Sequence, residues 1–474
     1  MKKIFFLLLC FISVTKCFGQ SDEEFYYGKG LSKYKRHDYH GAIADFNRAI
    51  ESDSTFADAY AYRGISKNEL HDYHGAIADY SRAIYLKPKY AKFYYNRGIS
   101  KNELQDYYGA IADFSMAIER DSTLANAYNN RGNAWGKLKD YRKAITDYNK
   151  AIEISPAYAE AFTNRGIINI SLLNYQDGIS DFNKSIEIDA SYGKAYLNRG
   201  NAKNSLQDYQ AAIRDFSKSI EINPSDGNAY LSRGNAKNSL HDYRNAVADF
   251  NRSIAIDSSN VMAFYYRGLA KNKLGDYRGG ILDFGKAIEI NPAFREVYDL
   301  RGYIKDDLHD YRGAIADFSK AIEINPADTN AYYNRGNAKH DLHDYQGAIT
   351  DFSKAIEINP NYAEAYNNRG FAKTKLQDLE GAMEDFSKTI EINPADTLAY
   401  YNRAVIKYAQ QDYQGAIADF CHAIEINPRY AEAYYSRGLA KINLLQRDNG
   451  CLDLSKAAEL GVKKALKQMK GECD

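Results

Sequence analysis

Four histidines near the N-terminus come closest, by residue type and spacing, to a metal site. They occur in the motif HDYH, at His37 and His40 and again at His71 and His74. Imidazole and carboxylate groups brought together in this way ligate zinc and related ions. The same two positions hold Gln, Lys, Tyr or Arg elsewhere in the chain, as exposed turn residues do. We therefore predict no metal site and keep these four histidines as the candidates for one.

Sequence patterns typical of enzymes are missing. The chain contains no GxxxxGK[ST] phosphate loop, no GxSxG elbow and no HExxH helix. Aspartates and glutamates recur at fixed spacing, as capping or pairing residues do, so no pair of them is singled out as general acid and base. We predict that the protein is not an enzyme and needs no cofactor.

One short pattern returns every 34 residues along almost the whole chain, without an insertion. It is centred on a glycine, usually preceded by arginine, and thirteen copies can be counted. The central residues are Gly30, Gly64, Gly98, Gly132, Gly166, Gly200, Gly234, Gly268, Gly302, Gly336, Gly370, Ala404 and Gly438.

Each copy contains two amphipathic helices, as the segment 329–362 illustrates. Its apolar residues recur with helical spacing on either side of residue 344. Asp344 is placed to cap the second helix, and Asn359-Pro360 ends that helix because proline cannot continue it. Small residues such as Gly336 and Ala348 mark where the two helices must approach closely.

These 34-residue units resemble tetratricopeptide repeats from about residue 22 to residue 460. The resemblance implies an all-α, right-handed superhelical solenoid of about thirteen helix-turn-helix repeats. We assign residues 22–462 to the array and residues 463–474 to a C-terminal capping helix. The chain departs from the commonest family pattern in having arginine where leucine usually precedes the glycine. We expect Arg335 to pair with Asp351, and its counterparts likewise, which would fix the register of the two helices.

The resemblance also implies that the first helices line a concave groove, so we predict an extended peptide or a partner protein as the ligand. A ladder of asparagines along such a groove is used by some tetratricopeptide proteins to hold a peptide by its backbone, because a carboxamide both donates and accepts hydrogen bonds. The equally weighted alternative is that these amides only solvate the groove or bond to a neighbouring helix. The candidate groove residues are Asn96, Asn130, Asn164, Asn198, Asn334, Asn368, Asn402, Tyr95, Tyr265, Tyr333, Tyr401, Asn133, Asn201, Asn235 and Asn337.

A glycan is the second candidate ligand, since tyrosine rings also stack on sugars. Lysine plus arginine and aspartate plus glutamate both number 62, so no excess of one charge draws the protein to nucleic acid. The sequence does not identify the partner or the oligomeric state.

The N-terminus has the three regions of a secretory signal peptide. Lys2 and Lys3 precede the apolar run 4–14, which is too short to span a membrane. We predict a signal peptide over residues 1–19, with cleavage near Gly19, and export to the periplasm, cell surface or medium of a bacterium without stable membrane insertion. A lipid anchor fits less well, because Leu9 and Lys16 precede the two cysteines of this segment.

Three cysteines follow the predicted cleavage point. If the capping helix folds back about residues 460–462, Cys451 and Cys473 lie at matching positions on the two arms. We expect them to form a disulfide in an oxidising compartment. Cys421 takes a position that is serine or asparagine in most copies and is assigned no role.

Overall fold

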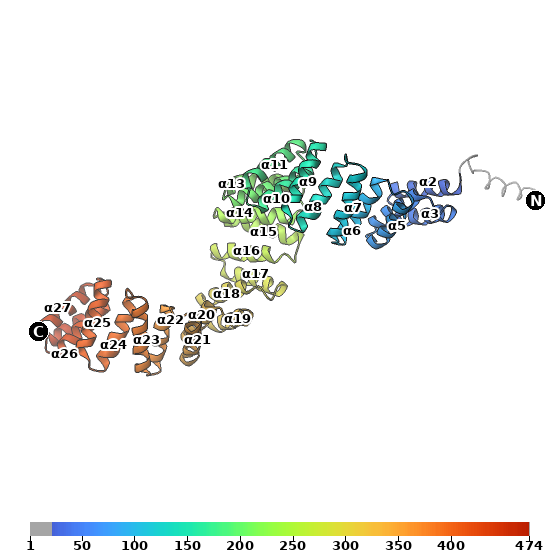
Figure 1. Cartoon of the computed structure of the whole chain (residues 1–474). Coiled ribbons are helices and arrows are strands. Elements are labelled where there is room, and N and C mark those ends of the chain that lie inside the picture. The colour runs from blue at the N-terminus through green and yellow to red at the C-terminus, as the bar shows by residue number, and fades with distance from the viewer. Residues whose placement is uncertain (1–20, 474) are drawn as a thin grey trace, which may run out of the picture. The chain divides into compact units, whose positions relative to one another are not determined.

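The computed structural model describes residues 21–473, which form 27 α-helices and no strand (Figure 1). The predicted signal peptide, residues 1–19, lies outside the described residues. The chain divides into two compact units at His241 and Asp242, and each unit is a row of antiparallel helix pairs. The predicted all-α array of helix pairs is therefore confirmed.

The first unit contains the helices α2 to α14. The first helices of its pairs are α2 (Asp22–Lys35), α4 (Ala57–Glu69), α6 (Ala91–Glu103), α8 (Ala125–Lys137), α10 (Ala159–Ser171), α12 (Gly193–Ser205) and α14 (Gly227–Ser239). The second helices are α3 (Tyr39–Ser52), α5 (Tyr73–Leu86), α7 (Tyr107–Arg120), α9 (Tyr141–Ile154), α11 (Tyr175–Ile188) and α13 (Tyr209–Ile222).

The second unit contains the helices α15 to α28. Its first helices are α16 (Val261–Lys273), α18 (Arg295–Asp307), α20 (Thr329–Asp341), α22 (Ala363–Lys375), α24 (Thr397–Ala409) and α26 (Ala431–Asn443). The second helices are α15 (Tyr243–Ile256), α17 (Tyr277–Ile290), α19 (Tyr311–Ile324), α21 (Tyr345–Ile358), α23 (Leu379–Ile392), α25 (Tyr413–Ile426) and α27 (Arg447–Glu459), and α28 (Lys463–Glu472) follows them.

Local chemistry sets the helix boundaries, as the pair α20 and α21 shows. His343 turns the chain with a φ of 64°. Asp344 then accepts a hydrogen bond from the Gly347 amide at 2.9 Å, which satisfies one of the free donors at the start of α21. The helix ends at Ile358, before Asn359-Pro360. Both predicted boundary signals are confirmed.

In most pairs the core is a phenylalanine or tyrosine of the second helix packed on the repeat glycine of the first. Leu454 replaces the aromatic residue in α27, and Ala404 replaces the glycine in α24. A Cβ atom added to Gly336 would come within 2.7 Å of the Phe352 ring, which is fully buried. Ala348 and Ala355 are also fully buried. Small residues therefore stand where the helices approach most closely, as the sequence predicts.

The predicted pair of Arg335 and Asp351 is present, and its equivalents recur in both units. The guanidinium donates to both oxygens of the Asp351 carboxylate, at 2.9 and 2.6 Å, and Lys339 approaches the same carboxylate at 2.7 Å. A third contact of the guanidinium reaches the preceding repeat, where Arg335 Nη1 donates to Ser319 Oγ of α19 at 3.0 Å. One arginine thus fixes both the pairing within a repeat and the stacking on the repeat before it.

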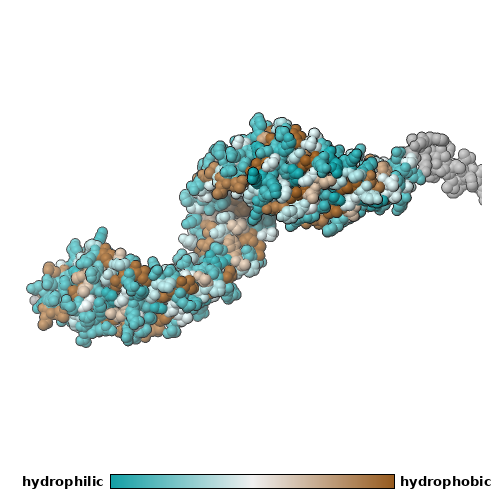
Figure 2. Space-filling model, in the orientation of Figure 1, coloured by the Kyte–Doolittle hydropathy of each residue, from teal (hydrophilic) through white to brown (hydrophobic). Residues whose placement is uncertain are grey.

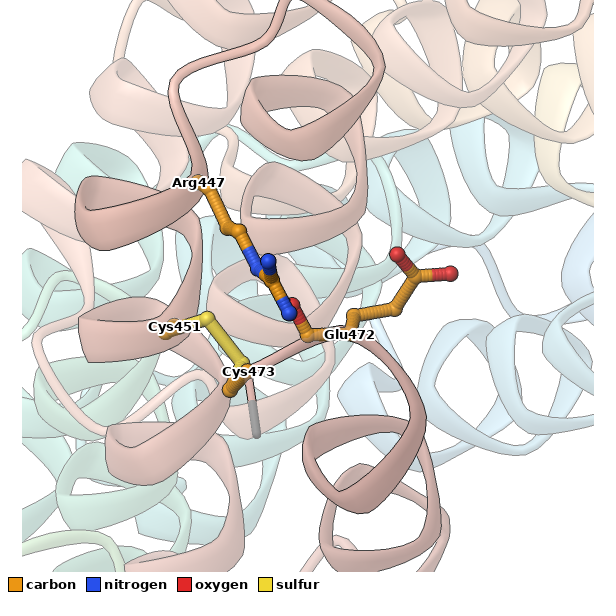
Figure 3. The surroundings of a disulfide bond; sticks show 4 residues. All are labelled: Arg447, Cys451, Glu472 and Cys473. Atoms are coloured by element: carbon orange, nitrogen blue, oxygen red, sulfur yellow. A yellow bond between two sulfur atoms is a disulfide. The ribbon is translucent and has the colours of Figure 1, made fainter.

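The C-terminal end of the second unit is closed by α28. Ala465 of this helix is fully buried, and it packs with Ala457 and Val462. A disulfide joins Cys451 of α27 to Cys473, with a Cα–Cα distance of 5.8 Å (Figure 3). Beside it, the Arg447 side chain donates to the backbone carbonyl of Glu472.

Within residues 21–473, no helix is both long enough and apolar enough to cross a membrane. The face drawn in Figure 2 shows hydrophilic and hydrophobic residues interspersed.

Candidate functional site

Three hollows of the described chain lie on the first helices and include several predicted groove residues. The hollow of the first unit has a volume of about 440 Å³ and is centred on α8 and α10. The second unit has hollows of about 460 Å³ and about 320 Å³ on α18, α20 and α22. We call these first-helix surfaces the groove face of each unit.

Amide and hydroxyl groups dominate the hollow of the first unit. Asn133 and Asn164, both predicted groove residues, line it. The Tyr148 hydroxyl donates to Asn133 Oδ1 at 2.7 Å, and burial raises the pKa of this phenol well above its usual range. The hollow is therefore a polar, hydrogen-bonding surface, to which Glu160 adds a negative charge and Lys137 and Lys194 add two positive charges.

Several of the predicted asparagines already bond to the preceding first helix. Asn130 and Asn368 each donate to a tyrosine hydroxyl, of Tyr95 and Tyr333 respectively, both at 3.1 Å. In the same way Asn164 donates to Asn129 Oδ1 at 3.1 Å. Asn334 donates to the Tyr303 hydroxyl at 2.5 Å. For these four residues the alternative of a bond to a neighbouring helix is realised, and their amide hydrogens are partly or fully used.

The other predicted asparagines are less constrained. Asn198 donates only to the carbonyl of Lys194 in its own helix, at 2.7 Å. Asn201 is exposed. Asn96, Asn198, Asn235, Asn337 and Asn402 are half-buried, and Asn337 Oδ1 accepts a hydrogen bond from Asn368 at 2.9 Å.

The predicted tyrosines are half-buried and pack against other rings. Tyr333 lies 4.9 Å from the Tyr362 ring and 5.8 Å from the Phe352 ring. Tyr265, Tyr401 and Tyr95 have similar aromatic neighbours. These rings therefore take part in the packing of the repeats, and part of each ring stays exposed.

The groove face of the second unit carries acidic residues that sequence reasoning missed. In the larger hollow, Arg295 Nη1 donates to Asp299 Oδ2 and to Asp328 Oδ2, both at 2.5 Å. Burial raises the pKa of Asp299 to about 6, against the effect of Arg295 and helped by Asp328. A signal for this cluster was present in the sequence, since Asp299 stands at a repeat position that holds no acid in any of the other twelve copies.

The four candidate metal-binding histidines do not form a site. His37 and His71 occupy the turns between helices, and the Nδ1 atom of each lies 2.8 Å from the hydroxyl of the tyrosine two residues later. His40 and His74 are exposed in the first turns of α3 and α5. Among residues 21–473, no group of three or more His, Cys, Asp or Glu residues could hold a metal ion.

Comparison with solved structures finds repeat proteins of the same helical kind. YrrB, described as a TPR protein with an unusual peptide-binding site, is 26% identical over 39% of this chain and 95% of its own, with a TM-score of 0.37. MamA is 27% identical over 35% of this chain and 96% of its own, with a TM-score of 0.34. The C-terminal part of a TPR repeat-containing protein from Cytophaga hutchinsonii is 20% identical over 51% of this chain and 98% of its own, with a TM-score of 0.47. No curated protein matches the chain.

Family models for this repeat match stretches in both units. A tetratricopeptide repeat model matches residues 27–91 and a second one matches residues 125–158, 193–226 and 363–396. A third, described as TPR repeat, matches residues 307–343, 336–377 and 405–444. With the 34-residue period and the stacked helix pairs, these matches show that the chain belongs to the tetratricopeptide repeat family.

Proposed function

We propose that the protein is a non-catalytic scaffold that binds an extended peptide segment of a partner protein on the groove face of its first helices. Proteins of this family commonly mediate protein–protein interactions. The observation that carries the proposal is that the three hollows described above are formed mainly by first helices and are lined by amides, hydroxyls and charged side chains. Such groups hydrogen-bond to a peptide backbone whatever its side chains are.

The amide bonds within the groove face refine the expected chemistry. Where the amide nitrogen of an asparagine donates hydrogen bonds to a neighbouring repeat, its carbonyl oxygen can still accept hydrogen bonds. Such positions accept hydrogen bonds from peptide N–H groups. Exposed amides such as Asn201 keep both functions.

Site-specific photo-crosslinking tests the proposal. A benzophenone amino acid is placed at Asn201, on the groove face, or at Arg214, an exposed residue of the second helix α13 of the same repeat. Irradiation with envelope extract should crosslink a partner protein at position 201 and not at position 214. Equal labelling at both positions, or labelling at position 214 alone, would move the interface away from the groove face.

We also propose that the protein is exported, with cleavage near Gly19. The sequence of residues 1–19 supports this, and the disulfide between Cys451 and Cys473 is of the kind that persists in oxidising compartments. Mass spectrometry of the protein isolated from the periplasm or medium should give an N-terminus close to residue 20. A protein that keeps residues 1–19 and is found in the cytoplasm would refute the proposal.

A further inference from the structure

Two neighbouring hollows on the groove face of the second unit differ in how their acids are neutralised. In the hollow of about 460 Å³, the chain supplies its own cation, because Arg295 lies between Asp299 and Asp328. The hollow of about 320 Å³ lies further along the same first helices. Its lining residues are Asp306, Asn337, His340, Asp341, Asn368 and Phe371. We call it the α18–α22 pocket.

The acids of the α18–α22 pocket have no strong basic partner. Within residues 21–473, neither Asp306 nor Asp341 forms an ion pair with lysine or arginine, and only His340 Nδ1 approaches Asp341, at 3.1 Å. Asp306 Oδ1 is shielded from solvent and accepts no hydrogen bond, which also holds for Oδ1 of Asn102, Asn204 and Asn272 at the same repeat position, but Asp306 alone brings a carboxylate there. Burial raises the pKa of Asp306, and Asp341 and Asp307 raise it further while His309 opposes them. A carboxylate left in this state is costly until a cation approaches it.

The other lining groups also suit a cation. Asn368 uses both amide hydrogens, on Tyr333 and on Asn337, so that towards a ligand it can only accept hydrogen bonds. The Phe371 ring attracts positive charge, and Lys375 Nζ already lies 4.9 Å from its centroid. Acceptors and an aromatic ring thus surround the same small volume.

The repeat itself does not require these acids. The residue four positions after the repeat glycine is Asp306 in α18, whereas other copies fold with neutral residues there, such as Asn102, Asn204 and Asn272. The acid at position 306 therefore has no part in the caps or ion pairs that build every repeat, whereas the position of Asp341 also holds an acid in other copies, at Glu69, Glu103 and Asp307. An added charge that departs from the repeat pattern and lines a hollow of the groove face points to a ligand.

We propose that the α18–α22 pocket receives the side chain of an arginine or lysine from an extended peptide, an inference that rests on the proposed function. The Asp306 and Asp341 carboxylates pair with the cationic group, and the Phe371 ring contacts it. The same groove face already contains one guanidinium bound by two carboxylates, since Arg295 donates to Asp299 and to Asp328.

Two peptides that differ in one charge test the inference. Both are acetylated, amidated nine-residue peptides of alternating serine and glycine, with either arginine or neutral, nearly isosteric citrulline at the centre. Calorimetric titration of residues 20–474 should give a Kd about tenfold lower for the arginine peptide, because a hydrogen-bonded charge pair adds about one decade of affinity. The difference should shrink as salt is added.

Two double variants test whether the preference for the arginine peptide arises in the α18–α22 pocket. Asp306→Asn with Asp341→Asn should abolish the preference for arginine, while Glu323→Gln with Glu357→Gln, which removes two exposed charges from second helices of the same unit, should leave it intact. Circular dichroism checks that both variants remain folded.

Each contrary result overturns the inference. The preference could survive in the Asp306 and Asp341 variant, or it could be lost equally in the control variant, which would show a long-range field rather than a pocket. Equal binding of the two peptides overturns the inference but leaves the proposed groove binding in place. Failure of both peptides to bind also overturns it, and the photo-crosslinking experiment then decides the proposed function separately.

Discussion

Replacing Gly285 with serine should strengthen the junction between α17 and α18. At the next junction, Ser319 Oγ accepts a hydrogen bond from Arg335 Nη1 at 3.0 Å and donates to the Ile315 carbonyl at 2.7 Å. Gly285 occupies the corresponding position in α17 and offers Arg301 no side chain. A Cβ atom added to Gly285 would lie 3.5 Å from Arg301 Nη1, an ordinary contact distance, so that serine fits there without a clash.

The size of the effect follows from two contributions. Exchanging glycine for serine within a helix gains about 0.5 kcal/mol, because the unfolded chain loses conformational freedom. A half-exposed hydrogen bond to a guanidinium adds about 1 kcal/mol. The control is Gly285→Ala, which gains about 1 kcal/mol from helix propensity alone and forms no bond to Arg301. The alanine variant therefore stabilises α17 only, whereas serine ties α17 to α18.

Hydrogen exchange measured by mass spectrometry separates the two effects. Because repeats depend mainly on their neighbours, local opening is more informative than unfolding of the whole chain. Opening of α18 should be about fivefold rarer in Gly285→Ser than in Gly285→Ala, which corresponds to about 1 kcal/mol. The reverse change Ser319→Gly should loosen α20. Equal protection of α18 in the serine and alanine variants would refute the idea that this side chain links successive repeats.

Three further predictions concern stability. Asp351→Ala should destabilise α20 and α21 by about 3 kcal/mol, because it leaves Arg335 and Lys339 without their shared carboxylate. Arg335→Leu should destabilise them by less, because Lys339 remains paired with Asp351. Urea unfolding of both variants tests this order, and equal losses of stability would contradict it. The Cys451–Cys473 disulfide closes a loop with a sequence separation of 22, and its reduction should destabilise α28 by about 3 kcal/mol. Hydrogen exchange with and without reductant measures this. Unchanged protection of α28 would show that packing alone holds the helix. The pKa of Asp299 is raised to about 6 in the folded chain, against an ordinary value of 3.8, so between these pH values the folded chain holds a proton that the unfolded chain has released. The contribution of Asp299 to stability should therefore be full below about pH 4 and be lost as the pH rises through 6. Thermal unfolding of the parent chain and of Asp299→Asn from pH 4 to pH 7 tests this, and a parallel pH dependence of the two proteins would contradict it.

The groove residues mark the limit of prediction from sequence. Repeat spacing correctly places Asn130, Asn164 and Asn368 on first helices. It does not show that their amide hydrogens are already bonded to Tyr95, Asn129 and Tyr333. Those bonds join residues 35 positions apart, and they depend on how far one first helix lies from the next. A departure from the repeat, such as Asp306, was visible in the sequence, but its lack of a partner was not.

The sequence by itself determined the helix pairs, their boundaries and the pairing of Arg335 with Asp351. Helix period, capping and proline act over a few residues, so they can be read locally. The repetition of the pattern also shows which residues every copy needs and which vary. Only the tertiary structure decided which side chains join one repeat to the next, such as Arg335 to Ser319 and Arg295 to Asp328. The physical reason is that hydrogen bonds between stacked helices require donor and acceptor within about 3 Å. That distance is set by the packing of whole helices against one another and not by the residues of any single repeat.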